Sequence, residues 1–249
     1  MLLKKRALAI ALAAMTTLPA VHSQINPALR LRLMEDDAET VLGQPCTVVQ
    51  QNEVTQQLAN GTTLTHRTIV RKWRDSQGRF RRESAQVEGD QPPVFQRASI
   101  VDPVNNTFVN LNLENKTATI FHLPDHGPDA LHSYVDQFDK EILALPGVQV
   151  KVEKLGGKTI AGVYAEGRRV TRFRPSGTVT LGNDKPIVSV RDQWVAQDLK
   201  ILLASTLDDP RHKEVTEVTN LDRSEPDPAL FQIPSDFTVR EVSVDSAQK

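Results

Sequence analysis

The sequence predicts a mainly β protein with a small helical part, of the α+β class. We expect a strongly curved antiparallel sheet, or incomplete β-barrel, of about 10 to 11 strands, with helices covering its concave face. Two observations predict this fold class. Segments of strand length, rich in Val, Thr and Ile, follow one another from residue 46 to the end. Turn sequences separate these segments, and only two amphipathic helical patterns accompany them.

The composition is that of an ordinary globular protein. The chain has 249 residues, of which 39% are hydrophobic and 24% are charged, and it contains a single cysteine. A chain of this length buries roughly 70 to 75% of the surface that its unfolded form exposes. The composition therefore excludes a disordered chain, a collagen, a disulfide scaffold and a polytopic membrane protein.

The first 23 residues have the pattern of a secretory signal. Lys4, Lys5 and Arg6 precede an apolar run over residues 7–20, and small or branched residues lead to Ser23. We predict cleavage after Ser23, a single domain over residues 24–249, and a periplasmic or secreted monomer that does not span the membrane. An uncleaved anchor helix is the alternative, although the run is shorter than the ~20 residues that span a bilayer. Without the signal, 27 basic residues face 31 acidic ones, a net charge of −4.

The elements of the first half follow in order. Asn26 and Pro27 favour the start of an amphipathic helix that ends at Gly43. Asn60-Gly61, a strong hairpin signal, joins strands predicted over 46–58 and 62–74. Further strands over 79–87, 99–101, 107–113 and 117–123 complete a β-meander.

The second half begins with a helical pattern over 129–145, which ends at Pro146-Gly147. A strand over 148–153 is expected to turn at Gly156-Gly157 into a strand over 159–173. The remaining strands are predicted over 187–195, 200–206, 214–221 and 237–244. No repeat or long linker divides the chain, which supports the single domain.

Cys46 has no second cysteine with which to form an internal disulfide. It also lies too far beyond the signal to be a lipid attachment site. We interpret it as a small buried hydrophobic residue at the start of a strand, with a reactive thiol or an intermolecular disulfide as the alternative.

A histidine-rich segment is the best candidate for chemistry. His122, Asp125, His126 and His132 lie within eleven residues, and imidazole and carboxylate groups at this density are able to hold zinc. The alternative is a polar connection in which Asp129 caps the following helix and the histidines are solvated. A metal-dependent hydrolase is the corresponding enzyme hypothesis.

A basic stretch contains the candidate ligand-binding residues Arg67, Arg71, Trp73 and Arg81. Alternation along a strand places the basic residues of this stretch on both faces of the sheet, so some are able to line a groove or meet an anionic partner. Paired surface charges without function are the alternative. The net acidic charge and the few aromatic residues disfavour nucleic-acid binding.

Two further motifs have structural interpretations. Leu155 to Thr159 imitates the end of a phosphate-binding loop, but Val152 stands where its first glycine is required, so a hairpin turn is expected. Asp209 and His212 offer an acid–base pair, yet turn chemistry also explains Asp208-Asp209-Pro210. We predict no cofactor and no catalytic residue.

The C-terminal segment over 221–239, LDRSEPDPALFQIPSDFTV, resembles the closing segment of periplasmic proteins related to the lipoprotein carriers LolA and LolB and to the regulator RseB. In it, Asp227 is expected to cap a one-turn helix begun by Pro228. The stretches over 73–83 and 182–187 are similar to a group of exported Gram-negative bacterial proteins, uncharacterised in function, that share this ending.

The resemblance implies an incomplete β-barrel with a helical lid and a hydrophobic cavity. It therefore implies a non-catalytic envelope protein that binds a lipid, an acyl chain or another hydrophobic ligand, or a lipidated envelope protein. An RseB-like sensor that binds the periplasmic segment of a membrane protein is the alternative. No ligand-binding residue of the carriers matches a position in this sequence.

Overall fold

The structure is a computed structural model that describes residues 41–122, 147–177 and 183–243. The helices predicted up to Gly43 and over 129–145 lie outside these residues, apart from a turn at 42–43. The prediction that helices cover the concave face therefore also falls outside the described part of the chain.

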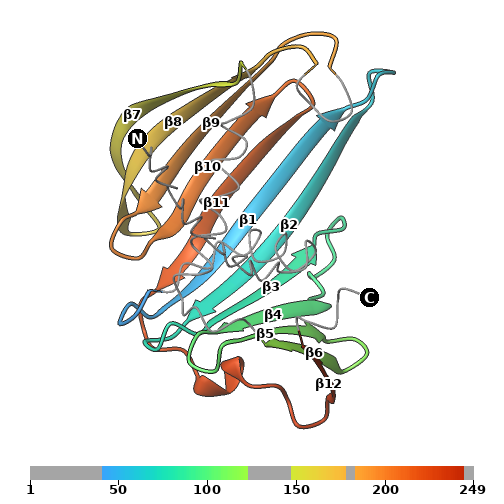
Figure 1. Ribbon diagram of the computed structural model, residues 1–249, viewed down its shortest axis with the longest axis vertical. Coiled ribbons are helices and arrows are strands. Elements are labelled where there is room, and N and C mark those ends of the chain that lie inside the picture. Colours follow the sequence, from blue (N-terminus) through green and yellow to red (C-terminus); the bar gives the residue numbers. More distant parts are fainter. Residues whose placement is uncertain (1–40, 123–146, 178–182, 244–249) are drawn as a thin grey trace, which may run out of the picture.

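The described residues form one curved sheet of twelve strands that does not close into a barrel (Figure 1). The strand order is β12-β6-β5-β4-β3-β2-β1-β11-β10-β9-β8-β7. This confirms the predicted mainly β, strongly curved sheet. The strands are β1 (Cys46–Gln57), β2 (Thr63–Arg74), β3 (Phe80–Gln86), β4 (Arg97–Asp102), β5 (Thr107–Asn112), β6 (Thr117–His122), β7 (Gln149–Ile160), β8 (Val163–Arg174), β9 (Ile187–Ala196), β10 (Ile201–Asp209), β11 (His212–Asp222) and β12 (Thr238–Ser243).

Every neighbouring pair of strands is antiparallel except β12 and β6, which are parallel. β11 lies in the middle of the sheet, so the chain must travel to the far edge before β12 can pair. It does so through the short 3-10 helix η1 (Pro228–Phe231), and such a crossover delivers a parallel strand. The purely antiparallel sheet that the sequence predicted is wrong for this strand.

The turn predicted at Gly156-Gly157 is also wrong. β7 continues through both glycines with an irregularity between Lys154 and Gly156, and the chain reverses at Ala161-Gly162 instead. Gly156 has a φ of +80°, which suits a glycine bulge. At Gly157, a Cβ atom would lie 2.1 Å from the hydroxyl oxygen of Tyr164. The two glycines therefore admit a bulge and a crossing side chain within one strand.

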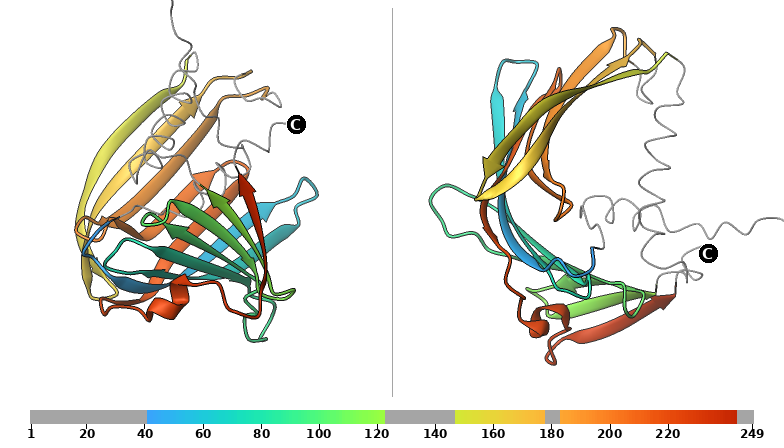
Figure 2. Two further views of the ribbon diagram at one scale, coloured as in Figure 1. Left: turned by 60° about the horizontal axis from the view of Figure 1, so that its bottom comes forward. Right: turned by 90° about the vertical axis from the view of Figure 1, so that its left-hand side faces the viewer.

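The two faces of the sheet differ in what covers them. In β2, Val70, Lys72 and Arg74 point to one face, and the residues between them point to the other. Figure 2 shows the sheet bent around one face, with η1 on the opposite, outer side. Ile233 and Phe237, from the segment after η1, pack against the outer face of β4–β6. The face that carries Val70, Lys72 and Arg74 is therefore the concave one.

Two apolar clusters hold the sheet together. One lies under the C-terminal segment, on the outer face of β4–β6; its buried members are Ala98, Ile100, Val109, Leu111 and Ala118. The other joins the start of β1 to β7–β11, and its buried members are Cys46, Val48, Ile160, Ala165, Ala196, Leu199, Ile201, Leu203 and Val218. Burial of these side chains stabilises the fold by about 25 cal/mol for each Å² of apolar surface removed from water.

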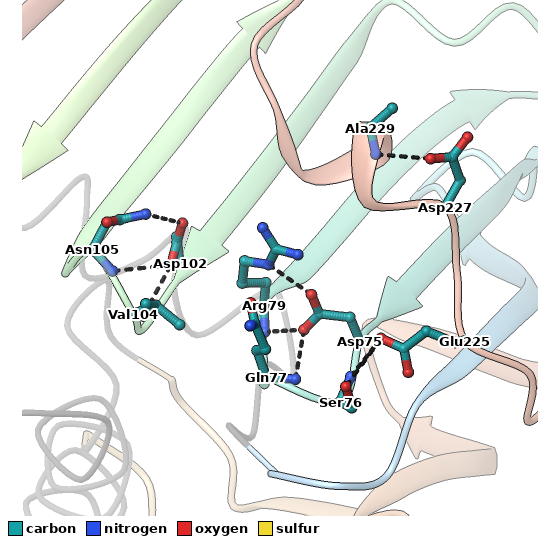
Figure 3. A network of polar contacts seen from close by, with 10 residues as sticks. All are labelled: Asp75, Ser76, Gln77, Arg79, Asp102, Val104, Asn105, Glu225, Asp227 and Ala229. Atoms are coloured by element: carbon teal, nitrogen blue, oxygen red, sulfur yellow. Dashed lines mark hydrogen bonds and ion pairs between the residues drawn. The ribbon is translucent and has the colours of Figure 1, made fainter.

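The turn after β2 is tied to the C-terminal segment (Figure 3). The Asp75 carboxylate accepts hydrogen bonds from the backbone amides of Gln77 and Arg79 and from Nε of Arg79 at 2.6 Å. Ser76 donates from its amide and its hydroxyl to Glu225, at 3.0 and 3.1 Å.

The predicted one-turn helix is confirmed as η1. Asp227 caps it by accepting a hydrogen bond from the Ala229 amide at 2.9 Å. Phe231 is buried, and the Arg79 guanidinium lies 5.1 Å from its ring centroid. Two of the stretches that carry the sequence resemblance, 73–83 and 221–239, therefore pack against each other.

Candidate functional site

A cavity of about 440 Å³ opens on the sheet over β3–β6. A volume of this size lies within the ~300–1,000 Å³ usual for small-molecule sites. The described residues that line it are Arg82, Ser84, Arg97, Ala98, Ser99, Phe108, Asn110, Leu111, Asn112, Thr117 and Thr119. Eight of these eleven have polar or charged side chains, which makes the cavity a polar one.

The strand register explains why these polar side chains meet. Residues that pair across antiparallel strands point to the same face, with Cβ atoms about 4.5–5.5 Å apart. The pairing gives two rows of polar side chains across β3–β6. One row is Arg82, Ser99, Asn110 and Thr119, and the next is Ser84, Arg97, Asn112 and Thr117. Arg82 pairs with Lys72 of β2 and Ser84 pairs with Val70, so both rows lie on the concave face.

An apolar row lies directly beside the polar ones. It crosses the same four strands on the same face and consists of Phe80, Val101, Phe108 and Phe121. The ring centroids of Phe108 and Phe121 are 6.0 Å apart, a contact distance for aromatic pairs. Phe108 also contributes to the cavity wall. The concave face over β3–β6 thus has an apolar row at one side of two polar rows. Phe80, Val101 and Phe108 of this row are buried, and Phe121 is half-buried.

Charge is divided between the two faces of β1–β6. The register places Lys72, Arg74, Arg82 and Arg97 on the concave face, and Arg67, Arg71 and Arg81 on the outer face. It places the acidic residues of these six strands, Glu53, Glu83 and Asp102, on the outer face. The Lys, Arg, Asp and Glu side chains that these six strands place on the concave face are therefore all basic.

A second cavity, of about 360 Å³, lies on the outer face across β11, β1 and β2. The described residues that line it are Gln51, Asn52, Glu53, Arg67, Thr68, Ile69, Val87, Val215 and Glu217. Arg67 donates from Nε to Glu53 at 2.8 Å, and Glu217 leaves the lining with a net negative charge.

The four basic-stretch residues predicted to bind a ligand all stand on the outer face. Arg67 lines the outer cavity, and the Arg71 guanidinium lies 4.2 Å from the Phe95 ring centroid. Trp73 is half-buried. Arg81 is buried, and it donates to Glu83 and to the backbone carbonyl of Leu230 at 2.9 Å. The structure does not bring these four residues to the concave cavity, and their role in binding stays a prediction.

The alternation of the strand contained the signal for the residues that do line the concave cavity. Arg82 belongs to the same basic stretch, but as the neighbour of Arg81 in β3 it points to the opposite face of the sheet. Strand pairing places it in one row with Ser99 and Asn110. The sequence analysis did not identify Arg97 because it predicted a strand over 99–101, whereas β4 begins at Arg97.

The predicted metal site is only partly described. His122 ends β6, and its Nε2 lies 3.2 Å from the Glu241 carboxylate on β12, in an exposed pair. Asp125, His126 and His132 lie outside the described residues, so the site as a whole stays a prediction. Within the described ranges, no group of three His, Cys, Asp or Glu side chains is placed to hold a metal ion.

Asp209, one of the two acid–base candidates at the turn between β10 and β11, has a structural partner. Burial favours the protonated form of Asp209, but hydrogen bonds from the Arg211 side chain and amide outweigh it and hold the pKa of this carboxyl below its ordinary value. Asp209 is thus an ionised turn residue bound to Arg211. Such a carboxylate is poorly suited to act as a general acid or base near neutral pH.

Cys46 is buried at the start of β1, where the sequence predicted a small hydrophobic residue. Burial raises the pKa of its thiol above the ordinary value, against the lowering effect of Arg74. A buried thiol with a raised pKa is a weak nucleophile.

No family model and no curated protein matches the chain, but several solved structures are similar to it. MucB is 17% identical, with 85% of this chain and 65% of MucB covered and a TM-score of 0.42. LprF from Mycobacterium bovis is 12% identical, with 82% and 98% covered and a TM-score of 0.31. The LolA superfamily protein of Nitrosomonas europaea is 8% identical, with 80% and 95% covered and a TM-score of 0.30.

The chain spans 65% of the length of MucB. Similarity at this level carries no argument about ligand or activity, which must come from the site itself. Among the described residues, no helix has the length and apolar character needed to cross a membrane.

Proposed function

We propose that this protein is a non-catalytic binding protein of the cell envelope that holds a lipid, an acyl chain or another partly hydrophobic ligand against the concave face of its sheet. The observation that carries the proposal is the cavity of about 440 Å³ on the concave face over β3–β6. Its lining is mostly polar, but the buried Phe108 contributes to its wall, and the half-buried Phe121 lies beside Phe108. A ligand with an apolar and a polar part matches such a surface.

The chemistry of the described residues supports a binding role over a catalytic one. The buried acids Asp75 and Asp209 are each held by an arginine of their own turn, and the buried Asp102 accepts hydrogen bonds from the backbone amides of Val104 and Asn105. The one cysteine is buried at the edge of an apolar cluster. None of these groups faces the concave cavity, so the cavity offers recognition rather than an activated nucleophile.

The proposed location follows from the sequence. A signal over residues 1–23 would send the protein to the periplasm or outside the cell, where lipids and lipidated proteins are available as ligands. N-terminal sequencing of the protein from the envelope fraction tests the cleavage after Ser23.

The binding proposal is tested with N-phenyl-1-naphthylamine, a neutral apolar dye that fluoresces on entering an apolar site. We expect the purified protein to take up the dye and native mass spectrometry to find co-purified lipid. Thr117→Trp, which fills the mouth of the concave cavity, should reduce dye uptake severalfold. Thr65→Trp, an exposed strand threonine on the outer face, is the matched control and should leave uptake unchanged.

Absence of both dye uptake and co-purified lipid would overturn the proposal. Equal uptake by Thr117→Trp and the unchanged protein would move the ligand away from the concave cavity. Capture of a membrane protein's periplasmic segment would then become the leading prediction.

A further inference from the structure

We infer that β7, the strand at one edge of the sheet, pairs with β7 of a second copy of this chain, so that two protomers form a dimer around a two-fold axis at Val152. The inference is independent of the proposed function, because no residue of β7 lines the concave cavity. It differs from the monomer predicted from the sequence, since the sequence does not show which strand lies at an edge.

β7 is exposed along most of its length. It is the last strand of the sheet, and among the described strands only β8 pairs with it (Figure 1). The side chain of Val152 is 61% exposed, and that of Val150 is 36% exposed. An edge strand offers unpaired N–H and C=O groups to a strand from another chain. The bulge between Lys154 and Gly156 interrupts this edge, so the part able to pair is the segment over 149–154.

The hairpin between β7 and β8 fixes the direction of the backbone groups. Ala161 and Gly162 have φ angles of +48° and +78°, and two positive φ angles are typical of a type I′ turn. The residues that close such a turn, Ile160 and Val163, exchange hydrogen bonds. Hydrogen bonding alternates along an antiparallel strand, so the odd-numbered residues of β8 direct their backbone groups to β7.

The outer edge of β7 therefore has a defined set of free donors and acceptors. The residues of the segment over 149–154 that pair with odd-numbered residues of β8 are Gln149, Lys151 and Glu153. The residues between them direct their N–H and C=O groups away from the sheet, and these are Val150, Val152 and Lys154. A second strand must bond to this second set.

Charge selects one register for the pairing of two identical segments. With Val152 opposite Val152 of the second copy, Lys151 of each chain lies opposite Glu153 of the other, and the outward-directed residues also meet one another. Opposite charges that face each other across strands are stabilising. Sliding one strand by two residues would instead place Lys151 opposite Lys151 or Glu153 opposite Glu153, which is destabilising. Larger shifts lose most of the ladder to the bulge or to the start of β7.

The occupant of the edge is thus a second copy of the same segment. Pairing of one surface with itself gives a closed two-fold dimer. A ladder over 149–154 is a small interface beside the ~1,200–2,000 Å² of a standard one, so the dimer should dissociate on dilution.

Sedimentation velocity of the purified protein over a series of concentrations tests the dimer. The sedimentation coefficient should rise from the value of a monomer to that of a dimer as the concentration increases. Val152→Pro should stay monomeric at every concentration. Because the N–H of Val152 points away from β8, proline removes a hydrogen bond of the dimer and none of the monomer. The urea midpoint of this variant should match that of the unchanged protein.

Charge exchange tests the register. Lys151→Glu and Glu153→Lys, each made alone, place like charges opposite each other and should weaken the dimer severalfold. The two changes together restore the opposite charges and should restore the dimer. Lys213→Glu is the matched control, because it makes the same change of charge at an exposed side chain at the start of β11 and should leave the dimer unchanged.

A protein that stays monomeric on its own at all concentrations overturns the inference, whether or not the strand of another polypeptide pairs with β7. Dimerisation of a folded Val152→Pro variant as strong as that of the unchanged protein would also refute it. If the double charge exchange fails to restore the dimer, the two-fold axis does not lie at Val152.

Discussion

Arg74 is the sharpest test of how the concave face is built. Its side chain is only 1% exposed, the largest of the fully buried side chains in the described residues. Nε donates to the Gln44 carbonyl at 2.9 Å and Nη2 to the Leu199 carbonyl at 2.8 Å. One side chain thus ties β2 to the segment before β1 and to the turn before β10.

Arg74→Met keeps much of the volume and removes both hydrogen bonds. Bonds to a charged group contribute about 1.5–3 kcal/mol each, so we expect a loss of about 3–6 kcal/mol in the free energy of unfolding. With a urea slope of about 1–3 kcal/mol/M, the unfolding midpoint should fall by more than about 1 M.

Arg67→Met on the same strand is the matched control. Arg67 is 66% exposed and paired with Glu53, and such surface pairs contribute about 0–1 kcal/mol. Urea unfolding followed by circular dichroism measures both variants. A loss below about 1 kcal/mol for Arg74→Met would refute the view that this arginine holds the two carbonyls, as would equal losses for the two variants.

Two further predictions concern thiol reactivity and pH. Because burial covers Cys46 and raises the pKa of its thiol, DTNB should label it only after unfolding in urea; rapid labelling of the folded protein at pH 8 would contradict its placement. A hydrogen bond from Arg169 lowers the pKa of Asp192, so this ion pair should stabilise the folded protein at neutral pH. The stabilisation should be complete above the ordinary carboxyl pKa of about 3.9 and should be lost as the pH falls through the lower pKa that Asp192 has in the folded protein. Asp192→Asn should therefore flatten the fall of the urea midpoint below pH 4, and an unchanged acid profile would count against this pair.

The antiparallel strands could be predicted from local signals, whereas the crossover to β12 and the bulge in β7 could not. Asn60-Gly61 and Asp75 to Gly78 are tight turns, and strand pairing follows directly from them. The parallel pairing of β12 depends on where η1 directs the chain, which is a tertiary property. Gly156-Gly157 looked like a turn because a bulge and a turn both favour glycine.

The candidate site was harder to predict because strand periodicity places residues on a face but does not say which face is concave. The alternation separates Arg67 and Arg71 from Lys72 and Arg74 correctly. The assignment of the latter two to the concave face required the position of η1 and its following segment, which cover the other side. The site residues Arg97 and Asn110 became visible only when the register joined β3, β4 and β5.

The central claim is that the ligand lies on the concave face over β3–β6. A crystal structure of the protein with its co-purified lipid is the decisive measurement. We expect density in the cavity beside Arg82 and Arg97, with any apolar part extending toward Phe108 and Phe121. Density in the outer cavity beside Glu53 and Arg67, with the concave cavity filled only by water, would contradict it.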